Sequence, residues 1–477
     1  MSNLLPISKE QLQTNIHAAL RAWHNPGGSR EDLLTDLLQV RQRQTAVAAD
    51  NSPSALRLAT NQILLEAIGE LEKQDQTAVR ILRARFIDRS KLIAVANKLN
   101  VSEHTVSRLQ RAAIEQLTDV LYGREQTTRR EQAQQIETRL PPATYTRLFG
   151  LEESGTAIEK LLLQAETPWV VALVGMGGIG KTALADAVTR QVIGHFSFDQ
   201  IVWLRSEPQT MSGHSHSPQL TFEDLITTLA GSLWPEATEM HSFAQRLLAV
   251  RQVLKQRPCL VIIDNLESET DTAYLLAHLY DLANPSKFLL TTRTRPAEQA
   301  LVFNFNVDEL SPADAAELLH HHARDIGIRA METATEVDIA HIYQVVGGNP
   351  LALKLVVSLL DLLPLSQILT HLTHRPAGKV EEMYRHIYWQ TWNVLSPQAR
   401  QLLQVMPLVA ESGGLPAYLC TLSDLTEAEL WPALQELRHR SLLEVRGTLE
   451  EKRYGIHRLT ETFLHTEIIH WADGQTS

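Results

Sequence analysis

Four short, mainly apolar runs recur in the middle of the chain, and three of them lead into polar residues. The runs are residues 169–174, 199–204, 259–263 and 288–290. Apolar stretches of this length are typical of strands that are buried on both faces of a parallel sheet. Helical patterns lie before and between them, as at residues 156–164 and 183–188. Because strands and helices alternate over residues 168–308, the pattern predicts an α/β fold with three layers around a parallel sheet.

The segments on either side of this region have a helical periodicity. Leucines spaced three and four apart predict an all-α N-terminal domain. Residues 336–372 have the pattern of a helical bundle, interrupted by a Gly-Gly-Asn-Pro sequence at residues 347–350. After residue 396, helices precede two short strands, which is the order of elements in a winged helix. We therefore expect four domains, at residues 1–140, 141–310, 311–385 and 386–477.

Residues 77–121 of the N-terminal domain have the pattern of a helix-turn-helix. One helical stretch ends at a tight turn formed by Asn100 and Val101, and Ser102 is a suitable N-cap for the next helix. Four apolar residues are expected to pack between the two helices: Ala96, Leu99, Val101 and Val106. In DNA-binding proteins of this type the second helix enters the major groove.

Five side chains are expected along the exposed side of the second helix, as the DNA-binding residues. They are His104, Thr105, Ser107, Arg108 and Arg111. Residues 78–117 resemble the helix-turn-helix of sigma-factor region 4. Residues 77–139 contain 12 basic and 7 acidic residues, a balance that favours DNA as the partner. The alternative is a helical adaptor that docks onto another protein.

The composition is that of an ordinary globular protein, with 44% hydrophobic and 21% charged residues. No apolar run is long enough to cross a bilayer, and the first residues lack the pattern of a secretory signal. The two cysteines, Cys259 and Cys420, provide neither a disulfide framework nor a cysteine-based metal site. These features predict a cytoplasmic protein.

The first apolar run leads directly into a glycine-rich sequence, GMGGIGKT, at residues 175–182. A strand, the pattern G-x-x-x-x-G-K-T and a helix, in this order, predict a phosphate-binding loop. The glycines let successive backbone N–H groups converge on phosphate oxygens, and the helix contributes the positive end of its dipole. Lys181 is expected to contact the β- and γ-phosphates, and the Thr182 hydroxyl is expected to bind Mg²⁺.

Two other apolar runs end in residues that suit the same site. The run at residues 259–263 is followed by Asp264, at the edge of the sheet where open α/β folds bind their ligands. We expect Asp264 to hold Mg²⁺ through water, opposite Thr182. The run at residues 288–290 is followed by two threonines and then by Arg293, a cation that can sense the γ-phosphate. A surface salt bridge is the alternative role of Arg293.

Taken together, these motifs resemble the NB-ARC branch of the STAND signalling NTPases. The resemblance covers residues 148–470 and rests on VGMGGIGKTALA, FDQIVWL, LVIIDNLE, FLLTTR and GGNPLAL, in that order. It implies an ATP/ADP switch with Mg²⁺ rather than a fast metabolic enzyme. It also implies a set of residues that bind the phosphates and the metal ion: Gly175, Gly177, Gly178, Ile179, Gly180, Lys181, Thr182 and Ala183.

The resemblance implies further roles outside the phosphate loop. Pro350 is expected to pack on the adenine, and His457 is expected to contact the β-phosphate of ADP when the winged helix closes over the nucleotide. Asn265 stands where the family often has a second acid for the attacking water. An amide orients water but cannot accept its proton, so slow hydrolysis is expected unless Glu267 substitutes. The catalytic residues expected on this basis are Lys181, Asp264, Asn265, Glu267 and Arg293.

These expectations combine into a switch. ADP is expected to lock the C-terminal domain onto the nucleotide domain, and ATP to release it for self-association, which presents several N-terminal domains at once. The expected output is DNA binding, in transcriptional control or defence, and the alternative is an NLR-like scaffold that recruits a protein. The sequence has no repeat period, so a separate sensor or effector protein is expected. A metabolic kinase is disfavoured because no acceptor-substrate lid is recognisable.

Overall fold

The chain folds into two compact units, which are residues 1–138 with 193–196, and residues 139–192 with 197–477. The computed structural model describes every residue except 1–6, 26–28, 30–32, 48–51, 207–216, 234–241, 267, 294, 297–301, 362, 374–384, 386–387, 390, 411–412, 441, 448–450, 457 and 470–477. Within the described part, no helix is long and apolar enough to cross a membrane.

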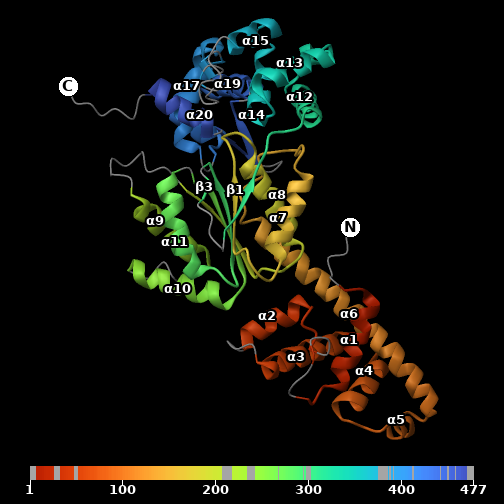
Figure 1. Cartoon of the computed structure of the whole chain (residues 1–477). Coiled ribbons are helices and arrows are strands. Elements are labelled where there is room, and N and C mark those ends of the chain that lie inside the picture. The colour runs from red at the N-terminus through yellow and green to blue at the C-terminus, as the bar shows by residue number, and fades with distance from the viewer. Residues whose placement is uncertain are drawn as a thin grey trace. The chain divides into compact units, whose positions relative to one another are not determined.

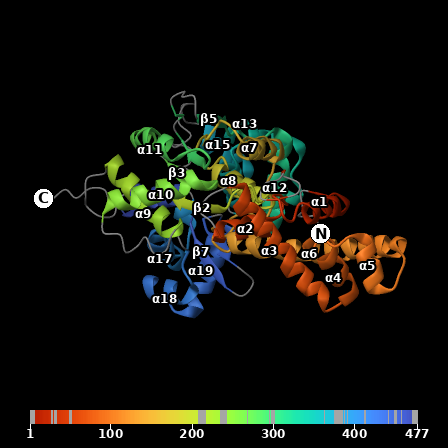
Figure 2. The same ribbon diagram turned by 90° about the horizontal axis from the view of Figure 1, so that it is seen from below.

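The N-terminal unit consists of helices, as its leucine spacing predicts. They are α1 (Lys9–Arg21), α2 (Leu38–Val47), α3 (Pro53–Glu72), α4 (Gln76–Leu82), the π-helical turn η1 (Arg83–Ile87), α5 (Leu92–Leu99) and α6 (Glu103–Glu137). Helix α6 has 35 residues, which makes it about 50 Å long at the rise of an α-helix. Helices α1, α3 and α4 pack against it through one apolar core that includes Ile16, Leu64, Leu82 and Leu117. Figure 2 shows α4 and α5 beside α6.

A buried ion pair ties α2 to α6 in this unit. Arg129 donates to Glu125 one turn earlier, at 2.7 Å, and both side chains are buried. The same carboxylate accepts the backbone N–H groups of Leu38 and Gln39. These N–H groups begin α2 and have no partner within that helix. Glu125 therefore caps α2 from a distance of more than eighty residues along the chain.

A left-handed turn joins α5 to α6. Asn100 has a φ of 52°, and Ser102 caps α6 by accepting the N–H of Thr105. Ala96 and Val106 are buried between the helices, and Leu99 packs against them, as predicted. Val101 was wrongly predicted to pack there, because its side chain is 37% exposed. Because Asn100 is left-handed, the N–H of Val101 points back and donates to the carbonyl oxygen of Ala96. The side chain of Val101 is then left outside the core.

The second unit is built around a five-stranded sheet (Figure 1). Its strands are β1 (Val170–Val174), β2 (Gln200–Arg205), β3 (Cys259–Leu266), β4 (Lys287–Thr292) and β5 (Val302–Asn306). They run parallel in the order β2-β3-β4-β1-β5. All five residues of β1 are buried, as the uninterrupted apolar run predicts. The parallel α/β sheet predicted from the sequence is confirmed.

Helices cover both faces of this sheet. On one face lie α9 (Pro218–Leu233), α10 (Phe243–Gln256) and α11 (Glu269–Leu282), and on the other α7 (Glu152–Leu163) and α8 (Lys181–Ile193) (Figure 1). An aromatic group formed by Phe222, Phe243 and Tyr274 holds α9, α10 and α11 together. These helices leave the carboxyl ends of the strands uncovered, and the site described below lies there.

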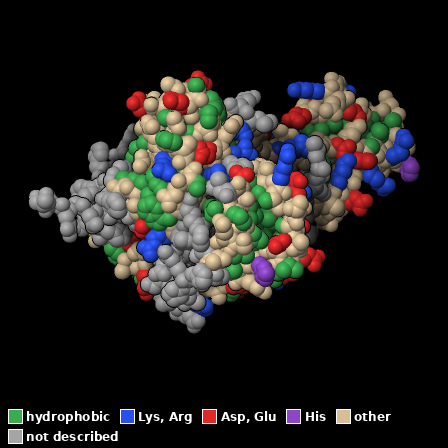
Figure 3. Space-filling view, turned by 90° about the horizontal axis from the view of Figure 1, so that it is seen from above, with side chains coloured by type: hydrophobic (Ala, Val, Ile, Leu, Met, Phe, Trp, Pro, Cys, Tyr) green, Lys and Arg blue, Asp and Glu red, His purple; other side chains and the backbone are tan. Residues whose placement is uncertain are grey.

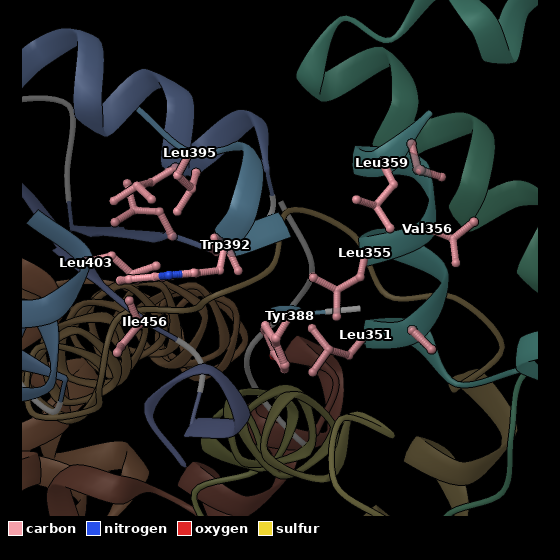
Figure 4. Packing of buried hydrophobic residues seen from close by; sticks show 14 of the residues in the cluster. Leu351, Leu355, Val356, Leu359, Tyr388, Trp392, Leu395, Leu403 and Ile456 are labelled. Atoms are coloured by element: carbon pink, nitrogen blue, oxygen red, sulfur yellow. The ribbon is translucent and has the colours of Figure 1, made fainter. Parts of the chain in front are cut away.

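The rest of the second unit is mostly helical and follows the sheet in the chain. Its elements are α12 (Pro312–Ile326), η4 (Arg329–Glu332), α13 (Glu336–Val346), α14 (Pro350–Leu359), α15 (Leu365–Thr373), α17 (Pro397–Val405), η5 (Met406–Val409), α18 (Pro416–Ser423), α19 (Glu427–His439), β6 (Glu444–Gly447), β7 (Lys452–Gly455), α20 (Arg458–Phe463) and η6 (Leu464–Ile469). Strands β6 and β7 form an antiparallel hairpin. Figure 4 shows one continuous core in which Leu355 of α14, Trp392, Leu403 and Ile456 take part.

Candidate nucleotide-binding site

The glycine-rich loop connects the end of β1 to the start of α8. Gly178 has a φ of 75° and Gly180 a φ of 101°, a region of backbone conformation that favours glycine. A Cβ atom at Gly178 would lie 2.8 Å from the Cβ of Leu351, which belongs to α14. The loop therefore needs a glycine at this position for a second reason, because α14 approaches it closely.

Lys181 begins α8 and folds back over the loop. Its ammonium donates to the carbonyl oxygens of Gly175 and Met176, at 2.8 Å each. The side chain thus lies over the loop whose N–H groups are expected to hold phosphates, and it lines the adjoining cavity. This position is compatible with the predicted contact to the β- and γ-phosphates.

Thr182 and Asp264 come together, as predicted from two motifs that lie 82 residues apart in the chain. The Thr182 hydroxyl donates to Oδ1 of Asp264 at 2.8 Å, and the hydroxyl of Thr291 donates to the same oxygen. Asp264 is buried at the carboxyl end of β3. Mg²⁺ prefers hydroxyl, carboxylate and water oxygens as ligands. The donor atoms present here fit a Mg²⁺ site that includes Thr182 directly and Asp264 directly or through water.

Asn265 adopts an unusual backbone conformation beside this acid. Its φ is 77°, and the pairing of β3 with β4 shifts register between Ile263 and Leu266. The side-chain amide of Asn265 donates to the carbonyl oxygen of Ser206, and its N–H donates to the hydroxyl of Thr291. The amide nitrogen thus connects the ends of β2 and β3, while the residue still lines the cavity.

A cavity of about 680 Å³ lies over the carboxyl ends of the strands. Cavities of this size hold molecules as large as a nucleotide. The predicted site residues that line it are Gly177, Gly178, Ile179, Gly180, Lys181, Thr182, Ala183, Asp264, Asn265, Arg293 and Pro350. Gly175 is not part of the lining. Glu267 and His457 lie outside the described residues, although Ile456, next to His457, does line the cavity.

Asn349 connects the phosphate loop to α14, and sequence reasoning missed it. Its side-chain nitrogen donates to the carbonyl oxygen of Gly177 at 3.0 Å. Its side-chain oxygen accepts the N–H groups of Leu351 and Ala352 and so caps α14. An Asn followed by Pro is a recognisable start of a helix. The contact to Gly177, 172 residues earlier, has no local signal.

Residues 141–149, which precede the sheet, form another wall that the sequence did not indicate. Tyr145 donates through its hydroxyl to Asp186 of α8 at 2.7 Å, and Arg190 donates to the same carboxylate. Arg190 also donates to the carbonyl oxygen of Pro141. Burial, together with the hydrogen bond to Asp186, raises the pKa of Tyr145. The phenol therefore stays neutral and keeps its role as a donor.

Charged and titratable side chains of α12 and α14 line the same cavity. Burial lowers the pKa of His322 to about 3, with a smaller contribution from the nearby charge of Lys354. Burial also lowers the pKa of Lys354, while the negative charges of Glu444 and Asp325 oppose that change. The imidazole of His322 is therefore neutral at pH 7.

In the N-terminal unit, the residues predicted to bind DNA lie at the start of α6. His104, Ser107, Arg108 and Arg111 are exposed. Thr105 is half-buried and its hydroxyl is hydrogen-bonded to Ser102 in the helix cap. Within the described part of the chain, no side chain pairs with Arg108 or Arg111. In Figure 3, blue basic and red acidic side chains lie at the far right, over the α5 end of this unit.

A strand, a glycine-rich loop and a helix, with a threonine and a buried strand-end aspartate beside them, define the site of a P-loop NTPase. Residues 151–326 match the sequence model of the NB-ARC domain. The match confirms the NB-ARC part of the resemblance seen in the sequence, over these residues.

The chain is similar to plant proteins over part of their length. The disease resistance-like protein DSC1 of Arabidopsis thaliana is 25% identical over 222 residues, which are 46% of this chain and 17% of that protein. The disease susceptibility protein LOV1 of the same plant is 24% identical over 311 residues, which are 62% of this chain and 33% of that protein. The chain thus spans a third or less of the length of these relatives.

Among solved structures, the chain is similar to a STAND protein with a tetratricopeptide repeat sensor from Pyrococcus horikoshii. The sequence identity is 20% and the TM-score is 0.41, over 68% of this chain and 43% of that one.

Proposed function

We propose that the chain is an ATP/ADP-dependent switch in which the bound nucleotide controls the elements that follow the sheet. The observation that carries this proposal is the hydrogen bond from Asn349 to Gly177, since it joins the cap of α14 to the phosphate loop. Any movement of the loop on binding phosphate acts directly on α14. The β6–β7 hairpin lines the same cavity through Glu444 and Val445, so it is placed to respond as well.

The chemistry of the site follows from its own residues. The loop N–H groups and Lys181 bind the phosphates, and Arg293 approaches the γ-phosphate from the end of β4. Thr182 and Asp264 would hold Mg²⁺, which would supply positive charge next to the phosphates. Asn265 can orient a water molecule but cannot accept its proton. We therefore propose slow hydrolysis, which suits a switch rather than a metabolic enzyme.

The C-terminal elements act in this proposal as a winged-helix lid. Helices α17 to α19 followed by the β6–β7 hairpin support it, as do the hairpin residues on the cavity wall. With ADP, the lid stays closed and His457 contacts the β-phosphate. Exchange for ATP opens the lid and exposes surfaces through which several copies associate.

The proposed output is DNA binding by the N-terminal unit. Two observations support it. The first is the left-handed turn between α5 and α6, and the second is that Arg108 and Arg111 at the start of α6 are exposed and have no partner among the residues that the structure describes. Arginines in this position are suited to phosphate and base contacts in the major groove. Association of several copies would add their DNA contacts together. The similarity to plant disease resistance proteins supports a role in defence, and transcriptional control is the other role that DNA binding would serve.

A second candidate output is recruitment of a protein partner, as in an NLR-like scaffold. It is favoured by Ile93, which is 54% exposed on α5, and by the exposed Val101 in the following turn. Apolar side chains in such positions are more typical of a protein interface than of a surface that faces phosphates.

One experiment tests the switch and its output together. The molecular mass of the full chain is measured by size-exclusion chromatography with light scattering, with ADP, with ATP and with a non-hydrolysable ATP analogue, in each case with and without random-sequence duplex DNA. We expect the mass to increase with ATP or its analogue, and this increase to be lost in Lys181→Ala. The matched control is Lys160→Ala, which removes an exposed lysine of α7 that lies away from the cavity.

Each outcome separates the alternatives. A mass that is independent of nucleotide in wild type and in both variants would contradict the switch. Nucleotide-dependent association without any DNA in the complex would reject the DNA output and favour the protein partner.

A further inference from the structure

Helix α14 contains a single charged residue, and that residue faces the nucleotide cavity. The sequence of the helix is PLALKLVVSL, in which eight of ten residues are buried. Leu355, Val356 and Leu359 point into the core of the second unit, as Figure 4 shows. Pro350, Leu351 and Lys354 line the cavity, and Leu351 belongs to the core as well. Positions i and i+4 lie on one face of a helix, so Lys354 lies one turn after Pro350 on the cavity wall.

Lys354 is half-buried and lacks a direct partner. Among the residues that the structure describes, none accepts a hydrogen bond from its ammonium or forms an ion pair with it. Its burial disfavours the charged form, and the negative charges of Glu444 on β6 and Asp325 on α12 offset that effect only through space. Charges in such surroundings are usually paired or bind a ligand.

The rest of the cavity indicates which kind of ligand Lys354 would bind. The N-terminus of α14 is held at the phosphate loop by the hydrogen bond from Asn349 to Gly177 and by the close approach of Leu351 to Gly178, so Lys354 belongs to a helix that contacts the loop. The phosphate chain of a nucleotide brings two to four negative charges into the cavity. An ammonium group and a phosphate oxygen form a charge-assisted hydrogen bond, which is stronger than a neutral one.

We propose that Lys354 is a phosphate-binding residue of this site, and that Glu444 of the β6–β7 hairpin competes with the nucleotide for it. This inference rests on the proposed nucleotide-dependent switch. With the phosphate chain bound, Lys354 turns to the nucleotide and its attraction to Glu444 weakens, so that the bound nucleotide and not Lys354 holds the hairpin. Without nucleotide, Lys354 attracts Glu444 and draws the hairpin towards α14. The pair links nucleotide binding to the C-terminal elements.

The first test compares ligands with and without phosphates. Dissociation constants of ADP and adenosine are measured by calorimetry for the full-length wild type, Lys354→Gln and Lys354→Arg. We expect Lys354→Gln to bind ADP about 10-fold more weakly, the effect of one charge-assisted hydrogen bond, and Lys354→Arg to retain most of the affinity. Adenosine binding should be unchanged. The control Arg324→Gln removes an exposed cation of α12 that lies outside the cavity lining and should leave both constants unchanged.

The second test is a double-mutant cycle with Glu444→Gln. We expect this substitution to tighten ADP binding about threefold in the wild type, because a competing charge is removed, and to have a smaller effect in Lys354→Gln. Equal effects in both backgrounds would reject the competition between Glu444 and the nucleotide.

The outcomes distinguish this inference from the proposal on which it rests. If the wild-type protein fails to bind ADP, both the nucleotide-dependent switch and the role of Lys354 are rejected. Tight binding by wild type that is lost in Lys181→Ala but unchanged in Lys354→Gln would reject the role of Lys354 alone. Equal losses of ADP and adenosine binding in Lys354→Gln would also reject it, because a phosphate contact cannot affect adenosine.

Discussion

The side chain of Asn349 forms hydrogen bonds in two directions, to the carbonyl oxygen of Gly177 and to the first N–H groups of α14. Serine at this position would retain the helix cap but would be too short to reach Gly177. We expect Asn349→Ser to unfold at nearly the wild-type denaturant concentration and to bind ADP about 3- to 10-fold more weakly, the effect of one lost hydrogen bond.

Asn349→Ala is the matched variant for this prediction. It removes the cap as well, so it should lose about 1 kcal/mol of unfolding free energy in addition to the same loss of affinity. Denaturant unfolding followed by circular dichroism and calorimetric titration with ADP measure the two effects. Wild-type ADP affinity in Asn349→Ser would show that the contact to Gly177 has no part in binding.

Asp264 provides a prediction about the metal ion. Its oxygen accepts hydrogen bonds from Thr182 and Thr291, and asparagine preserves the shape of the side chain without its charge. We expect wild type to bind ATP more tightly when Mg²⁺ is present, and Asp264→Asn to bind ATP equally with Mg²⁺ and with EDTA. Fluorescence titration with a labelled ATP measures the difference. Retention of the full Mg²⁺ effect in Asp264→Asn would place the ion elsewhere.

The buried pair of Glu125 and Arg129 should dominate the stability of the N-terminal unit. Glu125→Gln leaves the buried guanidinium of Arg129 uncompensated, which costs about 3–5 kcal/mol for pairs of this kind. The control is Asp119→Asn, which breaks an exposed ion pair with Lys9 and should cost at most about 1 kcal/mol. The free energy of unfolding of this unit is measured by urea unfolding of the full chain, monitored by protease cleavage within the unit. Equal effects of the two variants would contradict the prediction.

His322 should make the second unit sensitive to acid. Its folded-state pKa is about 3, below the unfolded value of 6.5, so the unfolded chain binds the proton first. The stability that this histidine contributes is complete above pH 6.5 and is lost as the pH falls from 6.5 towards 3. The slope is at most about 1.4 kcal/mol per pH unit, reduced by the partial exposure of the ring. Melting temperatures at pH 7.5 and pH 5 should differ less in His322→Asn than in wild type.

Arg108 and Arg111 allow the DNA output to be tested by its dependence on salt. Each arginine that contacts a phosphate contributes about one unit to the slope of log affinity against log salt concentration. We expect the double charge reversal to abolish retention on duplex DNA and each single substitution to reduce the slope. Lys73→Glu, at the end of α3, is the control. Unchanged retention in the double variant would favour the protein partner.

The sheet and the phosphate loop could be predicted because their signals are local. A buried strand, a glycine sequence and a strand-end acid each occupy a few consecutive residues, and the parallel topology follows from their alternation with helices. The meeting of Thr182 with Asp264 was predictable for the same reason, since Thr182 lies in the first turn of the helix after β1 and Asp264 lies at the carboxyl end of β3, at the same edge of the parallel sheet.

The other walls of the cavity could not be predicted in this way. Tyr145 and Lys354 line the cavity and Asn349 contacts its phosphate loop, and all three belong to segments whose position depends on long-range packing. Val101 fits an apolar pattern, but the left-handed conformation of Asn100 rotates it out of the core. A pattern of apolar positions specifies spacing along the chain, whereas a single reversed φ angle changes the direction in which the next side chain points.

The cavity also has a consequence for the folding equilibrium. It is lined by residues from the sheet, from α12 and α14 and from the β6–β7 hairpin, so a ligand that fills it binds the folded chain and not the unfolded one. A ligand at 1,000 times its dissociation constant adds about 4 kcal/mol to the free energy of unfolding. The lifetime of the folded chain would then follow the nucleotide supply of its surroundings, and nucleotide-free preparations would unfold and be degraded first.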